Sequence, residues 1–189
     1  MGKLVVTEFI TLDGVIEDPG GAEQFDRGGW TFQFDQGAEG GKFKVDELAA
    51  SDAQLLGRVT YEGFAAAWPT MEGTAEFGEK MNAMPKFVVS TTLKDPEWNN
   101  TTVLSGDLAD EVGKLKQQFD GDILVAGSAQ LVQSLLAGGL VDELRLMVFP
   151  VVLGAGKRLF AGGADATALK LVETRQTGAV AILTLAKSD

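Results

Sequence analysis

The sequence predicts an α/β protein with a mixed, mostly parallel sheet and an antiparallel hairpin near its C-terminal end. Apolar runs of strand length recur along the chain and are nearly continuous, as in strands that are covered on both faces. Stretches with helical spacing lie between them, and this alternation is typical of a sheet flanked by helices. Because the 189 residues contain no repeat and no linker, we expect one domain over residues 1–189.

The predicted strands fall into two kinds. The final pair, residues 169–171 and 180–185, alternates between apolar and polar residues and is separated by the turn residues 176–178, which is typical of a hairpin. The other runs are apolar throughout and predict buried strands. These runs are Leu4–Ile10, Leu55–Leu56, Phe87–Val89, Ile123–Val125 and Leu144–Leu153.

Four helices are predicted from apolar residues that recur every three or four positions. Capping residues and glycines indicate where two of them begin and end. The helices are Leu108–Phe119 with Asp107 as N-cap, Leu131–Leu136 with Ser128 as N-cap and Gly138 and Gly139 at its end, Val59–Trp68, and Lys42–Ala50 with Phe43 and Leu48 facing inward.

The segment from Thr11 to Gly37 is rich in glycine and shows no sustained period. A long stretch without regular structure inside a domain is often a lid or a binding loop, and the alternative is a surface loop that packs in a subunit interface. Within it, Trp30, Phe32 and Phe34 alternate like a short strand that lines a pocket or a dimer contact.

Composition excludes several classes of site. The chain has no histidine and no cysteine, which excludes a Ser-His-Asp triad, a thiolate nucleophile and Cys- or His-held metals. We predict no metal site. The net charge of −11 opposes binding to nucleic acid. No apolar run approaches the roughly 20 residues of a membrane span, so we expect a cytoplasmic protein without a membrane partner.

Three junctions directly after predicted strands have the composition of phosphate sites. Residues 57–62 open a helix with a glycine followed by Arg58, which combines free backbone amides with a cation. Residues 90–92, together with Lys94, supply hydroxyl groups and a charge, and residues 126–130 form another strand-to-helix turn. Ordinary turns explain each junction alone, but together they favour a polyanionic nucleotide in this acidic protein.

These junctions carry a family resemblance. Residues 57–62, Gly-Arg-Val-Thr-Tyr-Glu, resemble the Gly-Arg-x-Thr-aromatic-Glu motif of dihydrofolate reductases. Residues 139–144 and 150–160 are similar to the C-terminal reductase domain of the bifunctional riboflavin-biosynthesis protein and its stand-alone bacterial relatives, and the Asp13-Gly14 turn fits the same family. The resemblance covers essentially the whole chain and implies a dihydrofolate reductase-like three-layer sandwich.

The family binds NADPH along the carboxyl edge of its sheet, so the resemblance implies NADPH as the cofactor. The third junction departs from the folate enzymes, which have Gly-Gly where this chain has Ala126-Gly127. The resemblance then implies a role for each group of residues. The adenosine-side phosphates meet Gly57, Arg58 and Thr60, and the 2′-phosphate lies near Ser90, Thr91 and Lys94. The pyrophosphate receives amides from Gly127, Ser128, Ala129 and Gln130, while the nicotinamide and the substrate are bordered by Asp13 and Gly14.

The proton donor is less well indicated. Without histidine, Asp13 and the single tyrosine, Tyr61, are the candidates beside water, although packing explains Tyr61 as well. Trp68 either walls a ring-shaped substrate or packs in the core. No acid matches the substrate carboxylate of the folate enzymes. The acids in that stretch, which we expect to be solvated on a helix face, are Asp35, Glu39, Asp46 and Glu47.

The sequence therefore favours an NADPH-dependent reductase of a small pterin-like or aminopyrimidine substrate, as in the 5-amino-6-(5-phosphoribosylamino)uracil reductase step of riboflavin biosynthesis. The alternatives are a nucleotide-binding or ligand-sensing module with the same fold but no turnover, and a structural homodimer without a ligand. The resemblance implies a homodimer. The interface is expected at Leu144, Leu146, Val148 and Val152, together with the hairpin 169–185.

Overall fold

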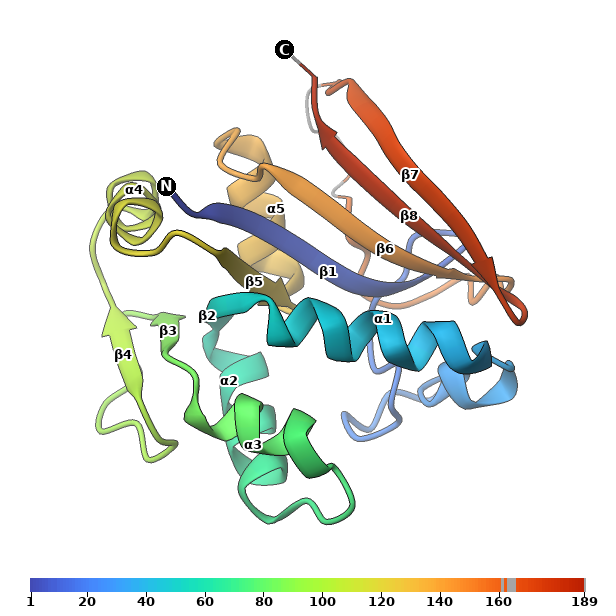
Figure 1. The fold of residues 1–189 in the computed structure, drawn as a ribbon, viewed down its shortest axis with the longest axis horizontal. Coiled ribbons are helices and arrows are strands. Elements are labelled where there is room, and N and C mark those ends of the chain that lie inside the picture. The colour runs from blue at the N-terminus through green and yellow to red at the C-terminus, as the bar shows by residue number, and fades with distance from the viewer. Residues whose placement is uncertain (161, 163–165, 189) are drawn as a thin grey trace.

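An eight-stranded sheet runs through the computed structural model, which describes residues 1–160, 162 and 166–188 (Figure 1). Its strand order is β4-β3-β2-β5-β1-β6-β8-β7. Neighbours from β4 to β6 are parallel, whereas β8 pairs antiparallel with both β6 and β7. The predicted fold class is confirmed. The strands are β1 Lys3–Thr11, β2 Ser51–Gly57, β3 Lys86–Val89, β4 Thr101–Leu104, β5 Asp122–Ala126, β6 Glu143–Phe149, β7 Leu169–Thr177 and β8 Val180–Lys187.

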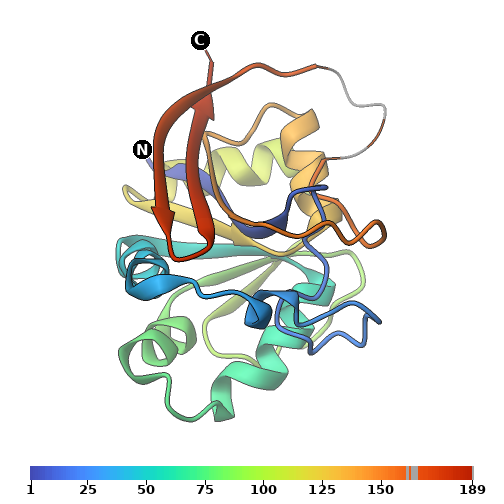
Figure 2. The same cartoon turned by 90° about the vertical axis from the view of Figure 1, so that its right-hand side faces the viewer.

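Helices cover both faces of this sheet and make three layers (Figure 2). One face packs against α4 and α5, and the other packs against α1, α2 and α3. Successive residues of β1 therefore enter opposite cores: Leu4 and Val6 face α4 and α5, whereas Val5 lies with the other three helices. The helices are α1 Gly37–Ala49, α2 Arg58–Ala67, α3 Ala75–Ala83, α4 Leu108–Gln118 and α5 Ala129–Ala137.

The C-terminal hairpin turns at Gly178 and Ala179, between the paired residues Thr177 and Val180. Gly178 has a φ of 56°, and a Cβ there would lie 2.3 Å from the Asp35 carbonyl oxygen, so the turn requires glycine. The Ala179 amide donates to that same carbonyl at 2.8 Å. The predicted hairpin is confirmed, and its turn is packed against the segment that leads into α1.

Several element boundaries differ from the sequence prediction. The helix expected from Lys42 begins at Gly37, and β6 ends at Phe149 because Pro150 has no N–H to continue the ladder. Two elements were not predicted: α3, and β4 with its short Thr-Thr-Val-Leu sequence. Neither has enough apolar residues to show a clear period.

The aromatic residues at 30–34 do not form the predicted short strand. Residues Trp30–Gln33 form a 3₁₀ turn, η1, and the Trp30 indole N–H donates to the Glu17 carbonyl at 2.9 Å. The Trp30 and Phe34 rings both pack edge-on against Phe149 of β6. The tertiary position of these rings under the sheet therefore overrides the alternation in the sequence.

The expected subunit interface is partly wrong. Leu144 and Leu146 are 1% and 5% exposed and lie in the core under α4 and α5, so neither faces a partner. Of the four residues, Val152 is exposed, at 68%. The exposed apolar pair in this region is Leu171 and Val172 on the edge strand β7, and a homodimer stays a prediction. In the described part of the chain, no helix is long and apolar enough to cross a membrane.

Candidate functional site

The carboxyl ends of β2 and β5 meet at one edge of the sheet, and a helix begins directly after each strand. β2 and β5 are neighbours, and α2 begins at Arg58 while α5 begins at Ala129. β5 lies between β2 and β1, and β1 runs parallel to it. The chain that leaves β1 therefore also passes this edge. Ligands of open α/β sheets bind at such edges.

Two reciprocal hydrogen bonds join these helix starts. The Gly57 amide donates to the Ser128 hydroxyl oxygen at 2.9 Å, and the Ser128 amide donates to the Thr60 hydroxyl oxygen at 2.9 Å. We refer to Gly57, Thr60 and Ser128 as the junction clamp. It fixes the start of α2 against the start of α5, although the paired residues lie far apart in the sequence.

Glycine at position 127 allows this close approach. A Cβ on Gly127 would lie 3.1 Å from the Thr60 methyl carbon, whereas a Cβ on Gly57 would meet the Ser128 side chain at an ordinary van der Waals distance of 3.4 Å. Gly127 also has a φ of 58°, which L-residues rarely adopt. The third junction therefore keeps its glycine for a geometric reason, although it lacks the Gly-Gly pair of the folate enzymes.

The N-termini of α2 and α5 have no capping side chain among the described residues. Gly57 has none to offer, and the Ser128 hydroxyl faces Gly57, so the prediction that Ser128 caps its own helix is wrong. Neither helix has an acidic residue in its first turn. Two adjacent helix starts with free amides and positive dipole ends fit a diphosphate, so the amides predicted at Ala129 and Gln130 are suitably placed.

Arg58 is the first residue of α2, directly after the clamp residue Gly57. One guanidinium nitrogen is 2.9 Å from each carboxylate oxygen of Glu62, one turn along α2. Both side chains are about half exposed, so solvent screens the pair and it contributes little to stability. The guanidinium can therefore exchange Glu62 for a ligand phosphate at low cost.

The loop after β3 lies one strand farther along the same edge. The Ser90 hydroxyl oxygen accepts hydrogen bonds from the amides of Thr92 and Leu93, at 3.1 and 2.9 Å, so this side chain shapes the loop. Thr91 and Lys94 are exposed. Of the three residues predicted near a 2′-phosphate, these two have side chains that point to solvent.

Asp13 connects the loop after β1 to the loop after β6. Its carboxylate accepts hydrogen bonds from the Thr11 hydroxyl at 2.6 Å and from the Leu153 and Gly154 amides at 3.2 and 2.8 Å. These bonds, the one from Thr11 above all, lower the pKa of Asp13 to about 2. Asp13 therefore remains ionised at neutral pH and is a poor proton donor, while Gly14 beside it has a φ of 82° that suits glycine.

Tyr61 and Trp68 are part of the core beneath α2. Tyr61 is buried, and its hydroxyl oxygen accepts a hydrogen bond from the Trp98 amide at 3.1 Å. The Trp68 ring packs against Phe64 and Phe77 at the far end of α2. At 1.5 Å per residue, that end is about 15 Å from Arg58. The packing interpretation therefore accounts for both side chains: Tyr61 lies in the first turn of α2 but is buried in the core, whereas Trp68 lies away from the carboxyl edge.

The acids on α1 and just before it behave differently from one another. Asp35, Glu39 and Asp46 are exposed as expected, but Glu47 is buried and forms an ion pair with Lys44 at 2.9 Å. Both reach Thr7 on β1, and Arg145 approaches the other Glu47 oxygen at 3.7 Å. The expectation of a solvated Glu47 is wrong because α1 lies with this side chain against the sheet.

Glu8 of β1 was not identified from the sequence, although it is a single acid within the apolar run 4–10. It is 5% exposed and lies near Gly127 at the carboxyl edge, where the Gly127 amide interacts with its carboxylate. A charged residue inside a run that predicts a buried strand is unusual, and this was the signal available. Glu8 places a carboxyl group next to the amides of the β5–α5 turn.

With this geometry described, comparison with known proteins decides the family. Residues 2–183 match the RibD C-terminal domain family. The chain belongs to this family. Its fold is that of the dihydrofolate reductase-like reductases, which confirms the resemblance seen in the motifs.

Relatives of this RibD C-terminal domain span nearly its whole length. Uncharacterized protein YyaP of Bacillus subtilis (strain 168) is 31% identical over 177 residues, covering 92% of this chain and 88% of that protein. A putative riboflavin biosynthesis protein from Shewanella sp. PV-4 has a similar structure, with a TM-score of 0.78, 19% identity and 99% of each chain covered. Dihydrofolate reductase from Enterococcus faecalis, in complex with NADP(H) and RAB-propyl, has a TM-score of 0.58 at 16% identity, covering 100% of this chain and 98% of that one.

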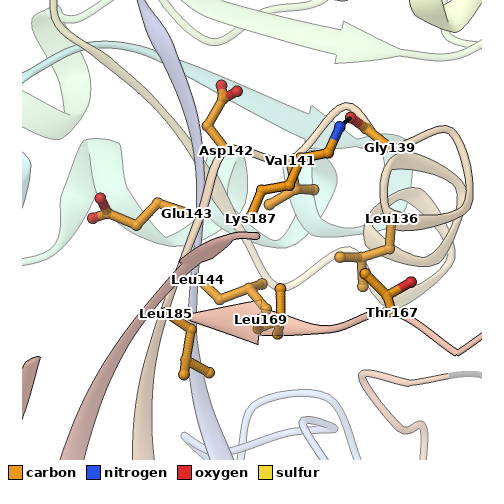
Figure 3. Close-up of a pocket in the computed structure, with 10 residues that line it drawn as sticks. All are labelled: Leu136, Gly139, Val141, Asp142, Glu143, Leu144, Thr167, Leu169, Leu185 and Lys187. Carbon is orange, nitrogen blue, oxygen red and sulfur yellow. Dashed lines mark hydrogen bonds between the residues drawn. The ribbon is translucent and has the colours of Figure 1, made fainter. Parts of the chain in front are cut away.

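This RibD C-terminal domain has two hollows, of which the smaller lies away from the clamp and the larger is lined by Tyr61 and Glu62, next to Thr60. One, of about 40 Å³, lies between the C-terminal end of α5 and the hairpin, where Leu136, Leu144 and Leu169 face it and Lys187 donates to the Gly139 carbonyl (Figure 3). It is far smaller than a typical ligand site. The other, of about 820 Å³, is an open hollow between α2 and residues 93–99. Over the described residues, no group of His, Cys, Asp or Glu is arranged to hold a metal ion.

Proposed function

We propose that this RibD C-terminal domain is an NADPH-dependent reductase of a small heterocyclic substrate, of pterin or aminopyrimidine type. The observation that carries the proposal is the junction clamp, which holds two uncapped helix N-termini side by side at the carboxyl edge. Family membership supports the same reaction class, and the complex of the Enterococcus reductase with NADP(H) supports a nicotinamide cofactor.

In this proposal the chain binds and orients the cofactor. The first-turn amides of α2 and α5 bind the diphosphate, and Arg58 adds a charge on the adenosine side. Thr91 and Lys94 lie along the edge toward a 2′-phosphate. NADPH, when bound, supplies the hydride, and the segment after β1 excludes water from the reacting ring.

A second candidate is a nucleotide-binding module without turnover. Two observations favour it: Asp13 is held ionised by the hydrogen bonds to Thr11 and the 153–154 loop, and the Tyr61 hydroxyl is used in the core. Both predicted proton donors are thus engaged elsewhere.

Binding and turnover separate the two candidates. NADPH binding is measured by its fluorescence, and turnover by loss of absorbance at 340 nm with a panel of pterins and aminopyrimidines. The reductase proposal expects both signals, whereas the module expects binding alone. Absence of NADPH binding at millimolar concentration would contradict both candidates.

Arg58→Ala tests the phosphate contact. The loss of a charge-assisted hydrogen bond is expected to weaken NADPH binding by about 1.5–3 kcal/mol, and to weaken NADH binding less. Arg175→Ala is the matched control, because Arg175 forms an equally exposed pair with Glu173 on β7. Equal losses of affinity for NADPH and NADH would refute a contact between Arg58 and the 2′-phosphate, the group by which NADPH differs from NADH.

A further inference from the structure

The position of Glu8 follows from the strand register. Thr7 is the last residue of β1 that pairs with β5, opposite Ala126, and Glu8 pairs with Leu146 of β6 on the other side. The Thr7 hydroxyl donates to Glu47 of α1, so the next side chain, Glu8, points to the opposite face, which α5 covers. Glu8 therefore lies one residue beyond the end of β5, beside the turn at Gly127.

The Glu8 carboxyl group is buried and only partly satisfied. The Gly127 amide interacts with it, but Oε1 has no hydrogen-bond partner among the residues that the structure describes. Native proteins rarely leave a buried side-chain oxygen unpaired, and a bound ligand is one way to satisfy it. This orphaned atom lies at the amide-rich turn to which the diphosphate is assigned.

The surroundings of Glu8 favour its neutral form. Burial has the largest effect and raises the pKa of Glu8 well above its ordinary value. Of the charged groups near it, Lys44 on α1 lowers the pKa, whereas Glu47 on α1 and Glu23 in the segment after β1 raise it. The facing residue of β6 is Leu146, and the first turn of α5 has no acid.

Ionisation of Glu8 would oppose a dinucleotide at this turn for two reasons. A carboxylate attracts the Gly127 amide more strongly than a neutral acid does, so it competes with a phosphate oxygen for the same donor. It also repels the negative charge of the diphosphate at short range in a buried position. A neutral carboxyl group does neither, and it offers an O–H donor to the ligand.

We propose that Glu8 is a dinucleotide-binding residue and that its carboxyl group carries a proton whenever a dinucleotide occupies the turn from Gly127 to Gln130. The inference rests on the proposed function, because it takes the ligand of this turn to be a nicotinamide dinucleotide. It assigns to Glu8 a role at the cofactor, on the face of the sheet opposite to Lys44 and Glu47. Binding then takes up one proton at a pH where free Glu8 is ionised.

The test measures NADH binding between about pH 6 and 9.5 by isothermal titration calorimetry. NADH is the probe because it has no 2′-phosphate, whose own ionisation near pH 6 would change the affinity. In the wild-type protein, Kd is expected to rise about tenfold per pH unit above the pKa of Glu8. Titrations in two buffers of different ionisation enthalpy are expected to show uptake of one proton for each NADH bound in that range.

Two variants identify the titrating group. Glu8→Gln keeps the shape and polarity of the side chain and is expected to bind NADH with a flat pH profile and no proton uptake. Glu8→Met is the second variant, to be used if the first does not fold. Glu23→Gln is the matched control, because it removes an acid near Glu8 and should keep the proton uptake.

The outcomes separate this inference from the proposed function. Wild-type protein that binds NADH with the same Kd below and above the pH at which free Glu8 ionises overturns the inference and leaves the reductase intact. Proton uptake that persists in both Glu8 variants also overturns it. Absence of NADH and NADPH binding at every pH overturns the proposed function, and the inference with it.

Discussion

Replacing Thr60 with valine tests the junction clamp directly. Valine keeps the γ-methyl group that contacts the Gly127 backbone region but removes the hydroxyl that accepts from the Ser128 amide at 2.9 Å. A partly buried amide without its partner costs about 1–2 kcal/mol, because water replaces the bond only in part. For a protein of this size we expect Tm to fall by roughly 2–8 °C.

The assay is urea unfolding followed by tryptophan fluorescence, together with thermal unfolding. Thr60→Ser is the matched variant, since it keeps the hydroxyl and loses the methyl group, and its dinucleotide affinity should stay near that of the wild type. Ser128→Ala breaks the second bond, to Gly57, and the double variant should deviate from additivity by about 0.5 kcal/mol or more because the bonds share a residue. A Thr60→Val protein within 0.5 kcal/mol of wild type, with unchanged NADPH binding, would refute the clamp.

Three further predictions concern the rest of the molecule. Arg145→Met should lower the free energy of unfolding by about 1.5–3 kcal/mol in urea titrations, because it removes the charged hydrogen bonds to the partly buried carboxylates of Glu143 and Asp122, while Glu47 keeps Lys44; a loss under 1 kcal/mol would contradict this. Lys86 is fully buried, and burial lowers its pKa from 10.5 to about 8, so the unfolded chain binds this proton more tightly than the folded protein does. The free energy of unfolding, relative to that of Lys86→Met, should therefore rise by about 2 kcal/mol from pH 7 to 9.5. A fall or a flat difference would show that the buried amine stays charged. Sedimentation should show a homodimer at micromolar concentration. The double variant Leu171→Lys, Val172→Lys should convert it to a monomer, whereas the control Val45→Lys on α1 should not. A monomeric wild-type protein would exclude the dimer.

The sequence alone was sufficient for the elements that local pattern controls. Continuous apolar runs predicted the buried strands, and the spacing of Leu108, Val112 and Leu115 predicted α4, whose N-cap Asp107 accepts from the Ala109 and Asp110 amides as expected. The turn chemistry before Gly178 predicted the hairpin, and the motif at 57–62 with the run at 150–160 identified the family. These elements can be predicted from the sequence because hydrophobic period and helix capping depend on residues within a few positions of each other.

The contents of the site depended on contacts that no local pattern encodes. Ser128 pairs with Thr60 across 68 residues and Asp13 with Gly154 across 141, so the predicted cap and the predicted proton donor both proved to have other partners. Glu47 has the sequence context of a solvated acid, and Glu8 differs only in lying within an apolar run, yet the sheet register and the docking of α1 bury both. The sequence determined most of the strands and helices and the positions of the turns for which phosphate binding is proposed. The tertiary structure alone decided which carboxyl pKa values are shifted and which helix starts lack a capping side chain, because both depend on the burial and the partners that distant segments provide.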